Sequence, residues 1–454
     1  MKIIISNDLQ IFEAPEPMLR KIRDTFTLEN PLWVDNHRMG RWLGKTDHWL
    51  TFFKNHPGGI TIPRGAMGLI IFFCREMDIQ YHINDQRRTM PDVNFTFSGI
   101  LKPYQQQAAT DILTRDFNVF QSGTGTGKTV VALYAIAKRK QPTLIIVHSK
   151  ELLNQWIDRV ETFLDIARTE IGVIGNGKMK IGEQISIGII NSIYPIADQI
   201  KDSFGHLIVD ECHRCPSRTF TEAVTAFDCR FVLGLSATPY RRDGLTKLIG
   251  WHLGRQVEVN QSDLTENDII QDVEVVIRKT DFITDYDASE EYSQMLSELT
   301  EDGERNRLVV KDVITEASNS GDVCLVLSDR KEHCRTLHDM LGKQGINADV
   351  LTGELSNVAR TAIVERLNAG DVRVLIATGQ LIGEGFDCKG LSTLFLATPI
   401  KFDGRLTQYI GRILRAAPGK EKAKVYDYVD VNVGVLKASA KARKRVYQQI
   451  GGCR

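Results

Sequence analysis

The chain has 454 residues, of which 42% are hydrophobic, 25% charged and 8% aromatic, close to the averages for globular proteins. This length leaves room for two or three domains and excludes a single small binding module, while the composition excludes a largely disordered or fibrous protein. Lysine plus arginine balances aspartate plus glutamate at 57 each, so any site for a polyanion must be a local patch.

We expect neither a membrane span nor a secretion signal in this sequence. No apolar run approaches the length of a membrane span, and the amino-terminal segment MKIIISNDLQIF lacks the apolar core and cleavage site of a signal peptide. The eight cysteines are scattered, which favours reduced thiols. Cys212 and Cys215 have C-x-x-C spacing, but no second ligand pair lies nearby, so we do not expect zinc. We expect a cytoplasmic protein with no membrane partner.

The amino-terminal residues, 1–97, are rich in aromatic and histidine side chains and are expected to form a small separate domain. Between residues 38 and 64 five cations accompany one acid, a net charge of +4, and tryptophans lie among them. This pattern is typical of a surface that binds phosphates and stacks bases. The alternative is that Trp42 and Trp49 belong to the core and that the charges only solvate a hairpin. The predicted DNA contacts here are Arg38, Arg41, Trp42 and Lys45.

From Gly99 onward, short β-branched runs alternate with helical stretches, which predicts parallel sheets buried on both faces. The first series of expected strands comprises residues 143–149, 185–191, 206–211 and 231–236. The second series comprises residues 323–328, 348–353, 372–378, 393–399 and 424–430. Between them, the acid-rich stretch 281–307 is expected to be helical. The pattern predicts two tandem α/β domains, residues 98–262 and 263–454.

A glycine-rich segment, SGTGTGKT, follows the apolar residues NVF and precedes the helix-like stretch TVVALYAIAKRK. A strand, a glycine loop and a helix in this order direct backbone N–H groups at phosphate oxygens. Lys128 would neutralise the β- and γ-phosphates of ATP, and the hydroxyl of Thr129 would bind Mg²⁺. A plain glycine-rich linker is the alternative. The predicted phosphate-binding residues are Ser122, Gly123, Thr124, Gly125, Thr126, Gly127, Lys128 and Thr129.

Two adjacent carboxylates, Asp210 and Glu211, follow the apolar run HLIV. Open α/β sheets bind their ligands at the carboxyl ends of buried strands. Together with the phosphate loop, this pair predicts ATP hydrolysis, with Asp210 holding Mg²⁺ and Glu211 activating the attacking water. Taken alone, adjacent acids after a strand also occur in solvated turns.

The phosphate loop and the DECH box, residues 210–213, together resemble the superfamily-two helicases, and the resemblance extends over residues 101–430. It implies that the two α/β domains are RecA-like and follow a small α+β amino-terminal domain. LKPYQQQA resembles the glutamine motif, which implies that Gln105 reads adenine. LIIVHSKELLNQW and INSI resemble segments that track nucleic acid, and GLSAT resembles the motif that links the ATP site to that track. The implied phosphate contacts are Ser149, Asn191 and Ser192.

In the second domain, TGQLIGEGFDCKG and QYIGRILRAAPGK resemble two further motifs of this family. The first implies that Gly385 and Asp387 approach the nucleotide. In the second, Gln408, Arg412 and Arg415 fall at i, i+4 and i+7 and share one face of a helix. The two guanidinium groups would stabilise charge on the γ-phosphate when the domains close. A solvated basic helix face is the alternative.

The DECH box, SATPYRRDG, EGFD and QYIGRILR look most similar to the XPB and UvsW type of DNA translocase. This resemblance implies an ATP- and Mg²⁺-dependent helicase that acts on duplex, forked or four-way-junction DNA, by branch migration and fork reversal in replication, recombination and repair. A phage-encoded protein would work in the host cytoplasm. A monomer is the working expectation, and protein partners stay open. The motor is expected to keep its ATPase activity without residues 1–97.

Two alternatives to this function remain. One is an RNA-directed helicase of the same superfamily, and the other is a DNA-binding ATPase switch that moves no strand. Both would use the same nucleotide site, so only a comparison of nucleic-acid substrates separates them.

Overall fold

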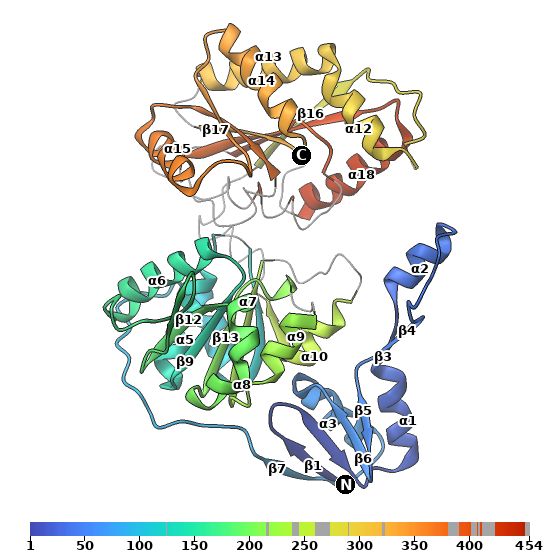
Figure 1. Cartoon of the computed structure of the whole chain (residues 1–454), viewed down its shortest axis with the longest axis vertical. Coiled ribbons are helices and arrows are strands. Elements are labelled where there is room, and N and C mark those ends of the chain that lie inside the picture. Colours follow the sequence, from blue (N-terminus) through green and yellow to red (C-terminus); the bar gives the residue numbers. More distant parts are fainter. Residues whose placement is uncertain are drawn as a thin grey trace. The chain divides into compact units, whose positions relative to one another are not determined.

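The structure, a computed structural model, contains two compact units, coloured blue to green and yellow to red in Figure 1. Residues 1–122 and 127–259 form the first unit, and residues 260–454 make up most of the second. None of the described helices is long and apolar enough to cross a membrane. The residues described are 1–123, 125–214, 218–237, 245–258, 273–288, 290–319, 323–379, 390–400, 406, 409–410 and 423–449.

A small five-stranded sheet in the order β5-β6-β2-β1-β7 opens the first unit. Its strands β1, β2 and β6 have a buried residue at every second position, so one face joins a core with helices α1 and α3. On α1, Met18 and Ile22 are four residues apart and point to that core. The elements are β1 (Lys2–Ile5), β2 (Leu9–Phe12), α1 (Glu16–Thr25), β5 (Lys54–His56), β6 (Gly59–Ile62), η1 (Arg64–Ala66), α3 (Met67–Glu76) and β7 (His82–Asp85).

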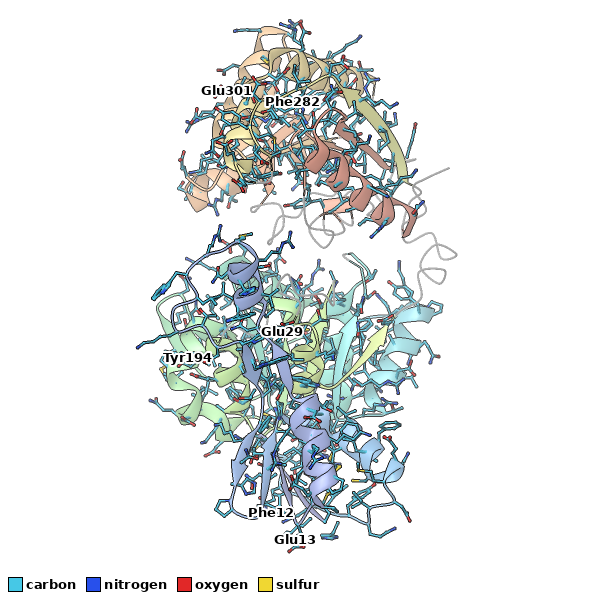
Figure 2. The ribbon with its side chains drawn as sticks, turned by 90° about the vertical axis from the view of Figure 1, so that its right-hand side faces the viewer. Phe12, Glu13, Glu29, Tyr194, Phe282 and Glu301 are labelled. Carbon is cyan, nitrogen blue, oxygen red and sulfur yellow. The ribbon has the colours of Figure 1, made fainter. Side chains whose placement is uncertain are left out.

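An arm leaves this sheet between α1 and β5 and stands away from the rest of its unit (Figures 1 and 2, with Glu29 at its base). It consists of β3 (Thr27–Glu29), helix α2 (Pro31–Arg38) and β4 (Trp49–Thr51), and β3 pairs with β4 in antiparallel register. No side chain of α2 is buried. The arm is therefore ordered without a hydrophobic core of its own.

The larger sheet of the first unit has eight strands in the order β11-β10-β12-β9-β13-β14-β8-β15, parallel except for the edge strand β11. Its strands are β8 (Phe117–Gln121), β9 (Thr143–Val147), β10 (Gly172–Gly175), β11 (Lys178–Lys180), β12 (Ile185–Ile189), β13 (His206–Val209), β14 (Phe231–Ser236) and β15 (Arg255–Glu258). Its helices are α4 (Pro103–Leu113), α5 (Lys128–Arg139), α6 (Lys150–Leu164), α7 (Ile190–Ile193), α8 (Ala197–Ile200), α9 (Arg218–Thr225) and α10 (Lys247–Leu253), with the short turns η2 (Tyr194–Ile196), η3 (Lys201–Ser203) and η4 (Cys212–Arg214).

Helices cover both faces of this sheet, which explains why its strands read as continuous apolar runs. On β9, Ile145 packs with α4, α5 and α6, while Leu144 and Ile146 pack with α7 and α9 on the other face. Successive residues of a strand point to opposite faces, so a strand covered on both sides needs an apolar residue at every position.

The amino-terminal sheet shares its core with the larger sheet through α10. Trp251 of α10 is 7% exposed and lies against the rings of Phe26 and Phe52, at centroid distances of 4.6 and 5.6 Å. Gly65 fits against this helix because a Cβ there would lie 2.6 Å from the Gly254 nitrogen. Residues 1–97 are thus packed onto the larger sheet through α10 and are not a loosely tethered module.

Arginines reinforce the same contact. The guanidinium groups of Arg64 and Arg87 lie 5.2 and 5.0 Å from the centroid of the Phe117 ring. Buried Arg64 also donates from Nη1 to the carbonyl of Cys229, at 3.2 Å. Arg88 forms a two-pronged ion pair with Asp228, at 2.9 and 3.1 Å. Three arginines of the amino-terminal segment therefore hold it against the part of the unit that contains the larger sheet.

The second unit is built on a six-stranded parallel sheet in the order β16-β21-β20-β17-β19-β18. Alternate residues of β17 again enter different cores, with Leu325 on one face and Cys324 on the other. Its elements are β16 (Val273–Thr280), α12 (Tyr292–Glu301), α13 (Gly303–Asn319), β17 (Val323–Ser328), α14 (Lys331–Lys343), β18 (Ala348–Leu351), α15 (Asn357–Ala369), β19 (Val374–Thr378), β20 (Leu391–Leu396), β21 (Ala423–Asp430) and α18 (Gly434–Gln449).

Each expected strand in both series is present in the structure, and the α/β prediction is confirmed. Two local expectations differ. Residues 281–288, 290 and 291 are not helical, and the helix of this stretch begins only at Tyr292. The strand expected over residues 185–191 ends at Ile189, and Ile190 begins the short helix α7.

Candidate active site

The predicted nucleotide-site residues of the first unit meet at the carboxyl edge of its larger sheet. The phosphate loop follows β8, the acidic pair follows β13, and β14 lies between these two strands. The Ser122 N–H donates to the Ser236 carbonyl at 3.2 Å, so the loop begins tied to β14. Parallel strands end at the same edge, which is why segments almost ninety residues apart converge.

The phosphate loop leads directly into α5. Gly127, at φ +83°, occupies the left-handed region at the N-cap, where glycine is favoured. The Thr126 hydroxyl donates to the Gly123 carbonyl at 2.8 Å, and Lys128 Nζ donates to the Ser122 carbonyl at 2.8 Å. The loop therefore closes on itself, with the lysine ammonium held over it at the amino-terminal end of α5, where backbone N–H groups favour an anion.

Gln105 lies beside this loop. It is 6% exposed, its Oε1 accepts from the Lys102 N–H at 3.0 Å, and its Nε2 donates to the Tyr104 hydroxyl at 3.2 Å. A Cβ at Gly127 would lie 2.4 Å from Nε2 of Gln105, so the amide packs directly on the phosphate loop. The glutamine side chain is thus fixed next to the loop, and its contact with adenine stays a prediction.

Asp210 is held by two donors. The indole Nε1–H of Trp156 donates to Oδ2 at 2.8 Å, and the Glu211 N–H donates to Oδ1 at 2.9 Å. Burial and the neighbouring Glu211 charge raise the pKa of Asp210, against the opposing effects of Trp156 and Lys128. The carboxylate is thus oriented, and a nearby cation would favour its charged form.

Glu211 has an unusual backbone for a non-glycine residue, with φ +49° in the left-handed region. This conformation costs about 1 kcal/mol, and such strain is concentrated at functional sites. Its Oε2 lies 3.2 Å from Nδ1 of His213, which is also 3.1 Å from the Ser236 hydroxyl. Burial alone would raise the pKa of Glu211, but the contact with His213 and the charge of Lys128 outweigh it and lower the pKa. The group is therefore ionised at neutral pH, as a base must be.

The donor set suits ATP with Mg²⁺. Carboxylate and hydroxyl oxygens are the ligands that Mg²⁺ prefers, and half-buried Thr129 lies in the first turn of the helix that follows the loop. The Ser122 hydroxyl is buried and makes no hydrogen bond within the described part of the chain, which leaves one more polar group at the loop for a ligand.

The nucleic-acid contacts predicted in the larger α/β region of the first unit lie on neighbouring elements of the same edge. Ser149 follows β9 and caps α6 by accepting from the Leu152 N–H at 3.3 Å. Asn191 is exposed and Ser192 half-buried on α7, which follows the adjacent strand β12. Ser149 thus has a structural role in capping, and its contact with nucleic acid stays a prediction.

The predicted contacts on the arm are all exposed. Trp42 is 90% exposed and Trp49 55% exposed, so the alternative that both tryptophans belong to the core is wrong. Arg38, Arg41 and Lys45 are also exposed.

Stacked rings order the arm in place of a core. Trp33 stacks on His37 and His48 at centroid distances of 4.8 and 3.7 Å, and His48 stacks on Trp49 at 4.7 Å. Asn30 accepts from the Leu32 N–H at 3.1 Å and donates to the Asp47 carbonyl at 2.7 Å. These contacts keep the arm in shape while its tip faces solvent.

Several predicted site residues lie outside the described part of the chain. These are Thr124, Thr238, Gly385, Asp387, Gln408, Arg412 and Arg415. Their roles stay predictions.

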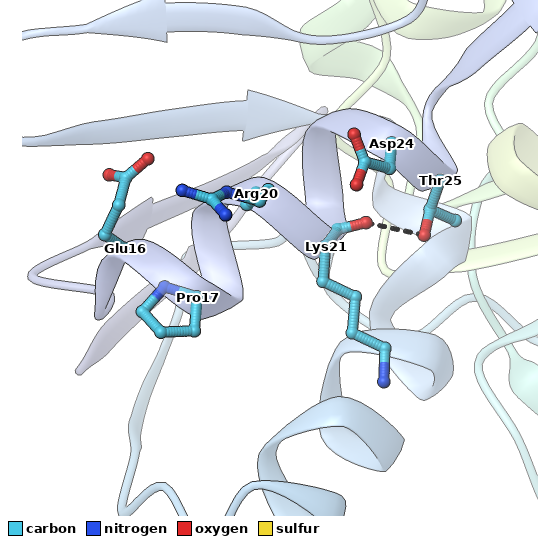
Figure 3. A pocket seen from close by; sticks show the side chains of 6 residues that line it. All are labelled: Glu16, Pro17, Arg20, Lys21, Asp24 and Thr25. Atoms are coloured by element: carbon cyan, nitrogen blue, oxygen red, sulfur yellow. Dashed lines mark hydrogen bonds between the residues drawn. The ribbon is translucent and has the colours of Figure 1, made fainter.

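A hollow of about 620 Å³ on the first unit is separate from this chemistry. The six residues that line it all belong to α1, and the Thr25 hydroxyl donates to the Lys21 carbonyl at 2.7 Å (Figure 3). No motif residue reaches it. The lining residues are Glu16, Pro17, Arg20, Lys21, Asp24 and Thr25.

Sequence reasoning missed two members of the site. His213 stands inside the DECH box, and its contact with Ser236 joins the acidic pair to β14. Trp156 closes the segment LLNQW, and its contact with Asp210 spans 54 residues of sequence. The sequence did contain a clue to the role of Trp156. A tryptophan on a helix face expected to be buried needs a hydrogen-bond partner for its indole N–H.

Comparison with known proteins agrees with this geometry. Residues 98–241 match the family described as the res subunit of type III restriction enzymes, and residues 306–417 match the helicase conserved C-terminal domain. A curated relative named putative ATP-dependent RNA helicase L396, from Acanthamoeba polyphaga mimivirus, is 26% identical over 79% of this chain and 70% of its own.

Two solved structures are similar to the chain. A fragment of a putative HsdR subunit of a type I restriction enzyme from Vibrio vulnificus YJ016 aligns over 78% of this chain and 67% of its own, at 20% identity and a TM-score of 0.59. T4 UvsW aligns over 100% of this chain and 98% of its own, at 19% identity and a TM-score of 0.45. The res-subunit and helicase C-terminal models match in chain order, and the fold brings the phosphate loop and the acidic pair together, so the chain is an ATP-hydrolysing helicase with the motifs of superfamily two.

Proposed function

We propose that this helicase is a DNA translocase that remodels branched or forked DNA at the expense of ATP. The observation that carries the proposal is the arm, which presents an exposed tryptophan and three exposed cations on a motor that already contains an ATP site. Its role in replication, recombination and repair follows from the resemblance of its motifs to the XPB and UvsW type.

Within the ATP site, each side chain has a role that fits its surroundings. Lys128 would bind the β- and γ-phosphates, Gln105 would contact the adenine, and Asp210 with Thr129 would hold Mg²⁺, which supplies charge neutralisation at the phosphates. Glu211 would take the proton of the attacking water, because its lowered pKa keeps it ionised. Its restrained backbone and the His213 contact fix where that carboxylate points.

The arm suits a nucleic-acid strand for two reasons. First, the tip from Arg38 to Lys45 carries three cations and no carboxylate, and the acids of the arm fall outside this stretch of sequence. Second, Trp42 offers a ring that is 90% exposed, and stacking on an exposed base is worth about 1–3 kcal/mol. Cations next to an exposed ring match a backbone phosphate next to a base. Because the stacked rings order the arm, binding would not have to fold it.

RNA is the second candidate substrate, and the name of relative L396 favours it. The arm does not discriminate, since phosphates and stacked bases occur in both nucleic acids. The motif pattern of the chain favours DNA. An ATPase switch that moves no strand is the remaining alternative.

One panel of substrates tests the proposal. ATP turnover of the full chain would be measured with duplex, forked and single-stranded DNA and with RNA, and a three-strand branch-migration assay would follow strand movement. We expect the greatest stimulation with forked DNA, and strand exchange that requires hydrolysable ATP. Stimulation by RNA alone would favour the second candidate, while turnover without strand movement would favour the switch.

Two variants serve as controls for the ATP site. Lys128→Ala should abolish turnover and leave most DNA binding intact. Glu211→Gln should bind ATP but hydrolyse it very slowly, because the amide cannot accept the proton. If Glu211→Gln lost ATP affinity instead, the roles of Asp210 and Glu211 would have to be exchanged.

A further inference from the structure

Trp156 joins helix α6 to the acidic pair by a single hydrogen bond. Its ring is 2% exposed within the core shared by α4, α5 and α6, and its Nε1–H donates to Oδ2 of Asp210 at 2.8 Å. The other carboxylate oxygen, Oδ1, accepts from the Glu211 N–H at 2.9 Å. Each carboxylate oxygen of Asp210 thus accepts one hydrogen bond. The donor to Oδ2 belongs to α6, a helix distant in sequence, and the donor to Oδ1 belongs to the next residue.

This arrangement defines the orientation of the carboxylate. The Glu211 N–H is carried by the chain next to Asp210 and follows any local movement, whereas Trp156 is anchored by α6, which runs from its cap at Ser149 to Leu164. Because this donor lies on a separate, tightly packed helix, it fixes the orientation of the carboxylate plane relative to the sheet. In metal sites such outer partners commonly set the affinity for the ion.

We propose that Trp156 is a positioning residue for the nucleotide site, which fixes the carboxylate of Asp210 so that it binds the Mg²⁺ that accompanies ATP. The inference rests on the proposed role of Asp210 as the metal ligand. Trp156 itself touches neither metal nor nucleotide. If Trp156 only filled the core, removal of its indole N–H would not change the Mg²⁺ concentration that ATP binding requires. The two roles can therefore be distinguished by measuring that concentration.

The test is Trp156→Phe in the full chain, which keeps an aromatic ring in the core and removes the N–H donor. Binding of N-methylanthraniloyl-ATP would be titrated with MgCl₂ and, separately, measured in EDTA. We expect the Mg²⁺ concentration at half-maximal tightening to rise about 10- to 100-fold, with unchanged affinity in EDTA. Benzothienylalanine at position 156 keeps the shape of the indole without its N–H, and it should reproduce the shift even if the phenylalanine variant folds poorly.

Val160→Ala is the matched control. Val160 is fully buried in the same core and on the same helix, so its truncation weakens packing without removing a donor to Asp210. Its thermal midpoint should fall while its Mg²⁺ dependence stays as in the wild type. A Val160→Ala protein with the same shift in Mg²⁺ would show that general loosening of α6 is the cause and would overturn the proposal.

Asp210→Asn separates this inference from the proposed function. If that variant kept the wild-type Mg²⁺ dependence, Asp210 would not be the ligand and the proposed site would fail. If it lost Mg²⁺-dependent tightening while both Trp156 variants behaved as the wild type, the site would stand and the positioning role would be refuted.

Discussion

The first 97 residues contain two regions with opposite construction. The five-stranded sheet with α1 and α3 buries a core and extends it onto α10 of the motor through Leu248 and Trp251. The arm, from Thr27 to Thr51, has no buried side chain on its helix and presents Trp42 to solvent. The sheet is stabilised by the apolar side chains that it buries, whereas the arm exposes a tryptophan, a residue that folded proteins usually bury.

This contrast separates stability from binding within a single segment. Burial of apolar area stabilises a fold by roughly 25 cal/mol per Å², so the sheet and α10 support each other. Exposed tryptophan contributes nothing of that kind and costs solubility, which is tolerated where a ligand covers it. Changes in the sheet should therefore alter folding, and changes in the arm should alter nucleic-acid binding.

The largest effect is expected from deletion of residues 1–97. The deletion would expose Trp251, Leu248 and Phe117 and remove the arginines that hold the segment on the motor. We expect the remaining chain to lose its cooperative unfolding transition in calorimetry and to aggregate. The sequence alone predicts the opposite, an ATPase that survives, so a soluble product with wild-type turnover would show that the shared core is dispensable.

Trp251→Ala should destabilise the first unit by about 3–5 kcal/mol, the usual range for truncation of a large buried aromatic residue. The ring is 7% exposed and lies between the two regions that it joins. Denaturant unfolding followed by circular dichroism measures the change. A loss below about 1 kcal/mol would mean that α10 and the amino-terminal sheet are independent.

Replacing Arg38, Arg41 and Lys45 by alanine should leave unfolding unchanged and weaken DNA binding. On duplex DNA the slope of log affinity against log salt should become shallower by about 0.9 for each cation that contacts a phosphate. Fluorescence anisotropy over a salt series gives the slope. Lys54 and Arg64, which lie outside the arm, provide the contrast, because a change at Lys54 should leave the slope as it is and a change at Arg64 should affect folding.

Trp42→Ala gives the smallest expected effect. Affinity for a fork with an exposed single strand should fall by about 1–3 kcal/mol through lost stacking, with a change in stability within about 0.5 kcal/mol. Trp42→Phe should restore most of the affinity. If Trp42→Ala lowered the affinity for forked DNA and for blunt duplex DNA equally, Trp42 would contact the DNA backbone and would not stack on exposed bases.

Much of the ATP site could be predicted from the sequence because its determinants are local. The glycines and Lys128 lie within one loop, and Asp210 and Glu211 directly follow one apolar strand. Parallel strands place all such segments at one edge, so the meeting of loop and acids followed from the strand pattern. The contacts of Asp210 with Trp156 and of His213 with Ser236 did not follow, because periodicity identifies a buried face and not the atom that a side chain on it will reach.

The sequence by itself determined the order of strands and helices, the two α/β domains and the residues of the phosphate loop and acidic pair, because apolar runs and glycine-rich turns act over a few residues. Only the tertiary structure decided whether Trp42 and Trp251 were buried. Both tryptophans have apolar and charged neighbours in the sequence, so their burial depends on which distant part of the chain packs against them. Trp251 on α10 packs against the amino-terminal sheet, while nothing in the described chain covers Trp42.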